Sequence, residues 1–108
     1  MLLPIVVALA LAPGTIRPDP GGGIVEHGET CPDGSVTARV AEYLGPDATV
    51  PLTIATTLQR RDDLWSLEVD IDGSRREFSA PHCATVIDAA AFVIAVTVDP
   101  TVADRPTP

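Results

Sequence analysis

The sequence contains no lysine. Its seven basic residues, all arginines, are outnumbered by fifteen aspartates and glutamates, which gives a net charge of −8 at pH 7. Binding to nucleic acid or to an anionic membrane surface depends on clustered positive charge. Four arginines form two pairs, Arg60-Arg61 and Arg75-Arg76, but both lie near predicted strand ends, where solvated charge is common. We therefore expect no nucleic-acid partner.

Long apolar runs are also missing. The run Leu2–Ala12 has 11 residues, whereas a transmembrane helix needs about 20. Its length is typical of the apolar region of a signal peptide, with cleavage after Ala10 or Ala12, although no basic residue precedes it. We predict a leader over residues 1–12 and a periplasmic or extracellular product with no stable membrane span. The alternative is a retained leader that tethers the domain to a membrane.

Motifs of common enzyme classes are absent, namely GxSxG, a phosphate-binding loop, CxxC and HExxH. The two histidines, His27 and His82, are the groups suited to acid–base chemistry near neutral pH. A metal would need Glu26, His27, Glu29 and Asp33 to gather, but they lack the spacing of ligand motifs. We therefore predict no catalytic residues, no metal and no cofactor. The acidic side chains of Glu68, Asp70 and Asp72 leave open a hydrolase in which His82 reaches them.

Only two cysteines are present, Cys31 and Cys83. An even number of cysteines behind an apolar leader indicates a disulfide formed in an oxidising compartment. The bond would close a loop of about 52 residues, which is worth roughly 4 kcal/mol in a chain-entropy treatment. A bond of this size can decide whether a small domain folds.

Proline and glycine divide the chain. Residues 13–30 are rich in both and predict a flexible tether, whereas residues 99–108 contain three prolines and predict the start of a linker. Between them, residues 31–98 form the predicted disulfide-closed domain.

Within this domain the pattern predicts the order α-β-β-β-α. Thr30-Cys31-Pro32-Asp33 has the features of a helix start, and apolar residues then recur at helical spacing up to Leu44. Alternation predicts strands over 50–60, 65–72 and 76–80, with a hairpin at Asp72-Gly73. A helix dominated by alanine, valine and isoleucine follows from Cys83 to Val98. The fold class is therefore α+β, a three-stranded antiparallel meander with two helices on one face. Both helices then begin at the same end of the sheet, which brings the cysteines together.

Four features of the sequence form one signature: Cys31-Pro32-Asp33 at the start of the first helix, the pattern Trp65-x-Leu67-x-Val69, Arg76 before Phe78, and Cys83 with its alanine-rich helix. This signature resembles a small domain of uncharacterised exported proteins of myxobacteria. More distantly, the arrangement is similar to the C-terminal domains of TolA and TonB, although their third strand follows the second helix. The second resemblance implies a periplasmic adaptor that engages its partners by strand addition.

We therefore expect a non-catalytic domain of the cell envelope that binds an envelope or extracellular protein through a sheet edge or the exposed sheet face. The residues that we predict to contact the partner are Trp65, Glu68, Asp70 and Arg76. A small secreted inhibitor is an alternative that the sequence leaves open, beside the hydrolase.

Overall fold

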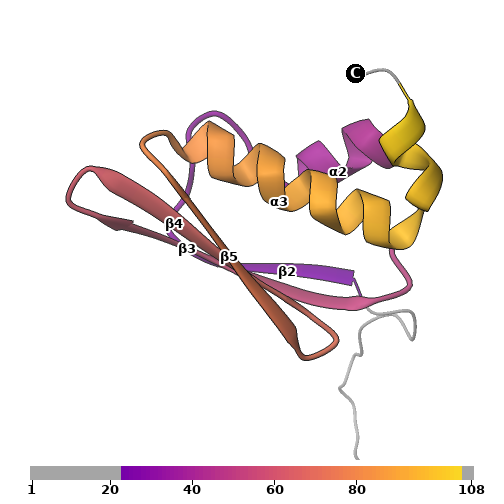
Figure 1. Cartoon of the computed structure of the whole chain (residues 1–108), viewed down its shortest axis with the longest axis horizontal. Helices are drawn as coiled ribbons and strands as arrows, with labels where there is room; N and C mark the ends of the chain where they lie inside the picture. Colours follow the sequence, from indigo (N-terminus) through magenta and orange to yellow (C-terminus); the bar gives the residue numbers. More distant parts are fainter. Residues whose placement is uncertain (1–22, 106–108) are drawn as a thin grey trace, which may run out of the picture.

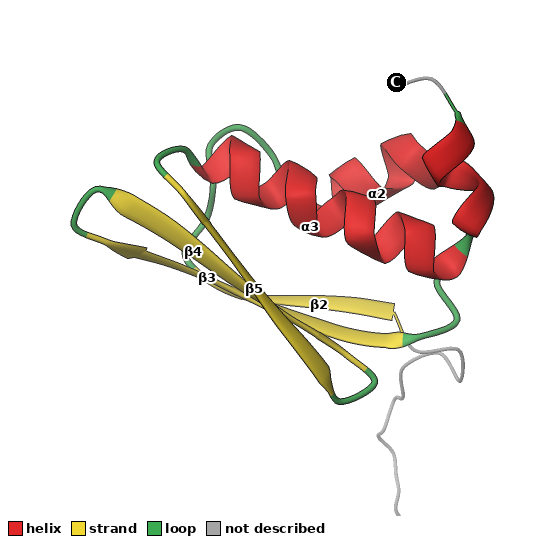
Figure 2. Ribbon diagram, viewed as in Figure 1, coloured by secondary structure: helices red, strands yellow, loops and turns green. Residues whose placement is uncertain are grey.

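The computed structural model describes residues 23–105, so the predicted leader lies outside the described residues. The elements are β2 (Gly23–Gly28), α2 (Val36–Leu44), β3 (Thr53–Arg61), β4 (Leu64–Ile71), β5 (Ser74–Ala80), α3 (Cys83–Val98) and the 3-10 helix η3 (Pro100–Asp104). The strands form one sheet in the order β2-β3-β4-β5, and both α-helices lie on the same face of it (Figure 1, Figure 2). The predicted α+β class is confirmed.

The sheet has one strand more than the predicted three-stranded antiparallel meander, so that part of the prediction is wrong. β2 pairs in parallel with β3, from Gly23 opposite Thr53 to Gly28 opposite Leu58, and lies within the predicted tether, residues 13–30. A Cβ atom at Gly28 (φ +91°) would overlap the Leu58 carbonyl oxygen. This glycine, which suggested flexibility in the sequence, therefore permits a close approach of two strands.

The segment predicted to begin the first helix forms a turn instead. The Gly34 amide donates to the Cys31 carbonyl at 3.2 Å, and Gly34 has a φ of +139°, which interrupts a helix. α2 begins one residue after Ser35, whose Oγ accepts a hydrogen bond from the Ala38 amide at 3.1 Å. Ser35 is thus the N-cap, and Cys31 lies in the loop before the helix.

The antiparallel part of the sheet agrees with the predicted alternation. β4 pairs with β3 on one side and with β5 on the other. The β4–β5 turn has positive φ at both Asp72 (51°) and Gly73 (91°), as a type I′ hairpin requires. Alternate side chains of the two central strands are buried beneath the helices, namely Ile54, Thr56 and Leu58 on β3 and Leu67 and Val69 on β4.

The helix α3 completes the core. It lies over β4 and β5 and packs beside α2. Its buried side chains are Cys83, Val86, Ile87, Ala90, Ala91, Ile94 and Ala95. Among residues 23–105, no helix has the length and apolarity that crossing a membrane requires.

Part of the predicted linker, residues 99–108, folds onto this core. Within η3, Val102 is only 4% exposed. Arg105 donates from Nη1 to the Tyr43 carbonyl at 3.2 Å and from Nη2 to Asp99 Oδ2 at 2.6 Å. The folded domain therefore extends to Arg105.

Candidate functional site

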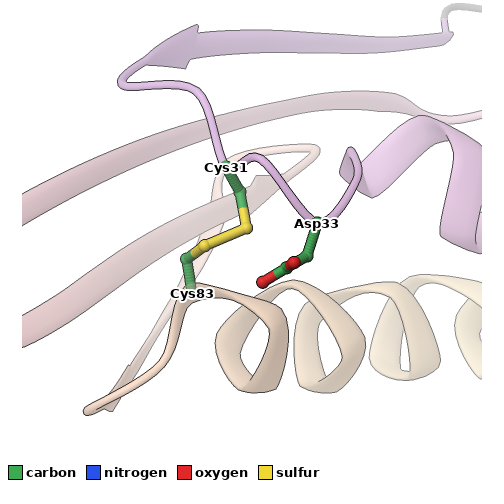
Figure 3. A group of neighbouring side chains, drawn as sticks. All are labelled: Cys31, Asp33 and Cys83. Atoms are coloured by element: carbon green, nitrogen blue, oxygen red, sulfur yellow. A yellow bond between two sulfur atoms is a disulfide. The ribbon is translucent and has the colours of Figure 1, made fainter.

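The disulfide joins the loop before α2 to the first residue of α3. Cys31 and Cys83 have Cα atoms 5.9 Å apart, and each is 5% exposed. Asp33 lies beside the bond, and the ligand atoms of the three residues are within 4.8 Å of one another (Figure 3). Both sulfurs are bonded to each other, so neither is a thiolate that would bind a metal. The predicted disulfide is confirmed, and this cluster is structural.

Glu26 ties the additional strand to α2. Its Oε1 accepts from the Val36 amide at 3.0 Å, and its Oε2 accepts from the Thr37 amide at 3.0 Å and from Thr37 Oγ1 at 2.6 Å. The carboxylate thereby satisfies two free amides at the positive end of the helix dipole. The neighbouring His27 points to the other face of the sheet, because adjacent strand residues alternate. Glu26 therefore has a structural partner, and the two side chains do not converge on one site.

Two cavities flank the disulfide. One, of about 360 Å³, lies between the N-terminal parts of α2 and α3 and is lined by Arg39, Glu42 and Asp88 among others. The other, of about 230 Å³, lies between β2, β3 and the loop before α2, where it is lined by Glu26 and Thr56 among others. Both are small and open to solvent.

A polar cluster links the two α-helices. Asp88, the one acidic residue of α3, accepts at Oδ1 from Arg39 Nε at 2.7 Å and from the Tyr43 hydroxyl at 2.8 Å. Arg39 also pairs with Glu42, and its guanidinium lies 4.9 Å from the centroid of the Tyr43 ring. The ring of Phe92 meets that of Tyr43 edge-on at 5.5 Å. The acidic residue that interrupts the apolar pattern of α3 is therefore paired across the helix interface.

Tyr43 and Arg39 of this cluster both have raised pKa values. Burial, followed by the hydrogen bond to Asp88, raises the pKa of Tyr43 above its ordinary value of 10.0. The hydrogen bond to Asp88 is also the main reason why the pKa of Arg39 is raised. A group that keeps its proton throughout the neutral range is poorly suited to general acid–base catalysis. We therefore assign a structural role to the cluster.

The histidine and the carboxylates of the hydrolase alternative lie far apart. His82 is the N-cap of α3 and follows the end of β5, where Ala80 is opposite Trp65. Asp70 lies five residues further along β4 than Trp65, opposite Arg75. At about 3.4 Å per residue this separation is roughly 17 Å. The His82–carboxylate pair that this alternative requires is therefore not formed.

The sheet face opposite the helices is polar and carries internal pairs. Arg75 lies 3.6 Å from Glu68 and 3.5 Å from Asp70, and Ser66 donates to Glu77 at 2.6 Å. These groups largely satisfy one another's charge and hydrogen bonds. A hollow of about 200 Å³ on this face is lined by Thr57, Gln59, Arg61, Ser66, Glu68 and Glu77. Val25 and Leu64 add exposed apolar side chains to the same face.

The edge strand β5 differs from this face. Within residues 23–105, β5 has a neighbouring strand on one side only. Arg76 is opposite the buried Val69, so it lies on the helix-facing side of the sheet, as does Phe78. Arg76 is exposed and has no hydrogen bond or ion pair to the described residues, whereas the adjacent Arg75 has two acidic partners.

The helix α3, which contacts β5, carries an apolar strip that is partly exposed. Ala89, Val93 and Val96 are only partly buried, and a rotation of about 100° per residue places them in one sector of α3, about 80–140° round the helix axis from Asp88. Phe92, on the adjoining surface, is 39% exposed. We call the three residues Ala89, Val93 and Val96 the α3 flank. The apolar character of α3 all round its axis was the sequence signal for this surface.

The four residues predicted to contact a partner do not form one patch. Glu68 and Asp70 lie on the open face, within the ion pairs of Arg75. Trp65 lies on the helix-facing side, packs against the core and has the Arg60 guanidinium 5.5 Å from its ring centroid. Arg76 lies near the start of β5, whereas Ala80, the residue opposite Trp65, lies at its end. Of the four, Arg76 lies on the edge strand itself.

Comparison with known proteins adds no further assignment. Neither a family model, nor a curated protein, nor a solved structure matches this chain.

Proposed function

We propose that this chain is an exported, non-catalytic interaction or accessory domain of the cell envelope that binds another protein through the β5 edge of its sheet. The observation that carries the proposal is β5 itself, a seven-residue edge strand beside the partly exposed α3 flank. An edge strand presents unpaired amides and carbonyls to which a strand of another protein can add.

Export is supported by the disulfide and by the apolar run at the start of the chain. Disulfides persist in oxidising compartments such as the periplasm and the extracellular space. Cys31 and Cys83 form this bond within the buried core, and the described residues contain no free cysteine. The resemblance to small exported domains and to the C-terminal domains of TolA and TonB favours the same class of function.

Site-specific crosslinking in producing cells tests the proposal. A photoreactive amino acid is placed at Ser79, an exposed position of β5, and at Glu42, an exposed position of α2, as the control. We expect a discrete protein adduct from Ser79 in the envelope fraction and none from Glu42. Equal adducts from the two positions, or none from either, would contradict the proposed function.

A further inference from the structure

We propose that the β5 edge takes an extended segment of a different protein in which one acidic and two apolar residues occupy every second position. This inference rests on the proposed function and specifies its partner. The acidic residue pairs with Arg76, and the apolar side chains lie against Phe78 and beneath the α3 flank.

The charge of the segment follows from Arg76. Directly opposite residues of paired strands point to the same side of the sheet, so the residue opposite Arg76 would lie on its helix-facing side. The other five arginines of residues 23–105 have partners, since Arg39, Arg75 and Arg105 pair with acids, Arg61 contacts Gln59, and Arg60 lies over Trp65. Arg76 is therefore the arginine whose charge is available to a ligand on this edge.

The apolar positions follow from strand alternation. Phe78 and Ala80 share the helix-facing side with Arg76 and are partly buried. Side chains placed opposite them in an added strand would enter the space beside α3, where the α3 flank is apolar. The intervening side chains would extend the polar open face, next to Glu77 and Ser79. The edge therefore selects a segment with one acidic and two apolar residues at every second position.

A second copy of this chain fits the edge less well. Each copy has a net charge of −8, and like-charged proteins repel one another. Pairing of two β5 strands would also bring a second Arg76 to the interface instead of a carboxylate. We therefore commit to a segment of another protein, and pairing of two copies becomes an outcome that the test detects.

The test uses the full oxidised chain, labelled with ¹⁵N, and three capped seven-residue peptides. In the first peptide, threonines alternate with one aspartate and two valines. In the second peptide asparagine replaces the aspartate, and in the third peptide lysine replaces it. We expect the aspartate peptide to shift the amide signals of β5 and of the α3 flank. We also expect it to bind about three- to fivefold more tightly than the asparagine peptide, as for one cross-strand ion pair, and the lysine peptide to bind most weakly.

Two neighbouring arginines provide a matched pair of variants. Arg76→Gln should remove the preference for aspartate over asparagine, whereas Arg75→Gln, on the opposite face of the same strand, should leave it unchanged. Val93→Thr, which keeps the shape of the side chain, should weaken the binding of all three peptides by about the same factor. A thermal melt of each variant verifies that the domain remains folded.

Three results would overturn the inference. They are an absence of shifts at β5 up to millimolar peptide, a preference for aspartate that survives Arg76→Gln, and a dimer paired through β5 in light scattering and amide shifts. Shifts at β2 or the open face in place of β5 would reject this partner assignment, while the Ser79 crosslink would still report separately on whether the domain binds a protein.

Discussion

Replacing Glu26 by alanine should destabilise the domain more than any other substitution of an exposed acid in β2 or the loop that follows it. The carboxylate accepts two backbone hydrogen bonds, from the Val36 and Thr37 amides, and one from the Thr37 hydroxyl. Loss of a helix cap costs about 1–2 kcal/mol, and loss of a negative charge at a helix N-terminus costs roughly 0.3–1 kcal/mol in addition. We therefore expect a loss of about 2 kcal/mol for Glu26→Ala.

Denaturation in urea measures this change as a shift of the midpoint at unchanged slope. For a domain of 60–100 residues, about 2 kcal/mol corresponds to a decrease in Tm of roughly 8–16 °C. Glu26→Gln retains one acceptor oxygen without the charge and should lie between the wild type and Glu26→Ala. Glu29→Ala, three residues along the chain, is the control, because the Glu29 side chain has no hydrogen bond to the described residues. Equal effects of Glu26→Ala and Glu29→Ala would refute the role of Glu26 in stabilising the first turn of α2.

Three further predictions concern the helix interface, η3 and the disulfide. Absorbance titration of Tyr43, the single tyrosine of the chain, should give a pKa above 10.0. The stability that the neutral Tyr43 side chain contributes is present below the unfolded pKa and is lost as the pH rises through the folded value. Tyr43→Phe should lower the free energy of unfolding by about 1 kcal/mol at pH 7. The side-chain hydrogen bond from Thr101 is the main reason why the pKa of Asp99 falls below its ordinary value of 3.8, with the Thr101 amide and Arg105 adding to it. An NMR titration should find a smaller depression in Thr101→Val than in the wild type, because the backbone and Arg105 contacts remain. The contribution of Asp99, present above its unfolded pKa, should be lost as the pH falls through the folded value. Substitution of both Cys31 and Cys83 by alanine should lower the free energy of unfolding by roughly 4 kcal/mol, and a loss below about 1 kcal/mol in urea denaturation would contradict that account.

The sequence predicts the elements whose periodicity is strong. The alternation from Trp65 to Ile71 and the Asp72-Gly73 turn locate β4 and its hairpin, and the apolar residues after Cys83 locate α3. The disulfide also follows from the sequence, because both cysteines precede or begin helices that pack on one face. These features depend on local patterns and on the shortest connections between them.

The additional strand could not be predicted in this way. β2 has six residues, of which the first and last are glycine, and its helix-facing Glu26 is a polar residue that accepts from the first amides of α2. Its partner β3 lies about 30 residues away and pairs in parallel, a relation that leaves no local periodic signal. The shifted start of α2 has a similar cause, since Pro32 and Asp33 suit both a helix start and the turn that Gly34 imposes.

The candidate surface was predicted only in part. Arg76 is one of the four residues predicted to contact a partner, but its separation from Trp65, Glu68 and Asp70 depends on the strand register. The α3 flank depends on where α2 packs, because an apolar helix leaves a different side exposed for each position of its neighbour. Tertiary packing therefore decides which of the apolar and charged residues face a partner.

The intact mass of the protein from the native envelope fraction, measured after alkylation with and without prior reduction, tests most directly whether this is an exported, disulfide-closed domain. We expect a mass that lacks the leader over residues 1–12, with no alkylation before reduction and two alkylated thiols after it. A full-length mass with Cys31 and Cys83 both alkylated before reduction would contradict it.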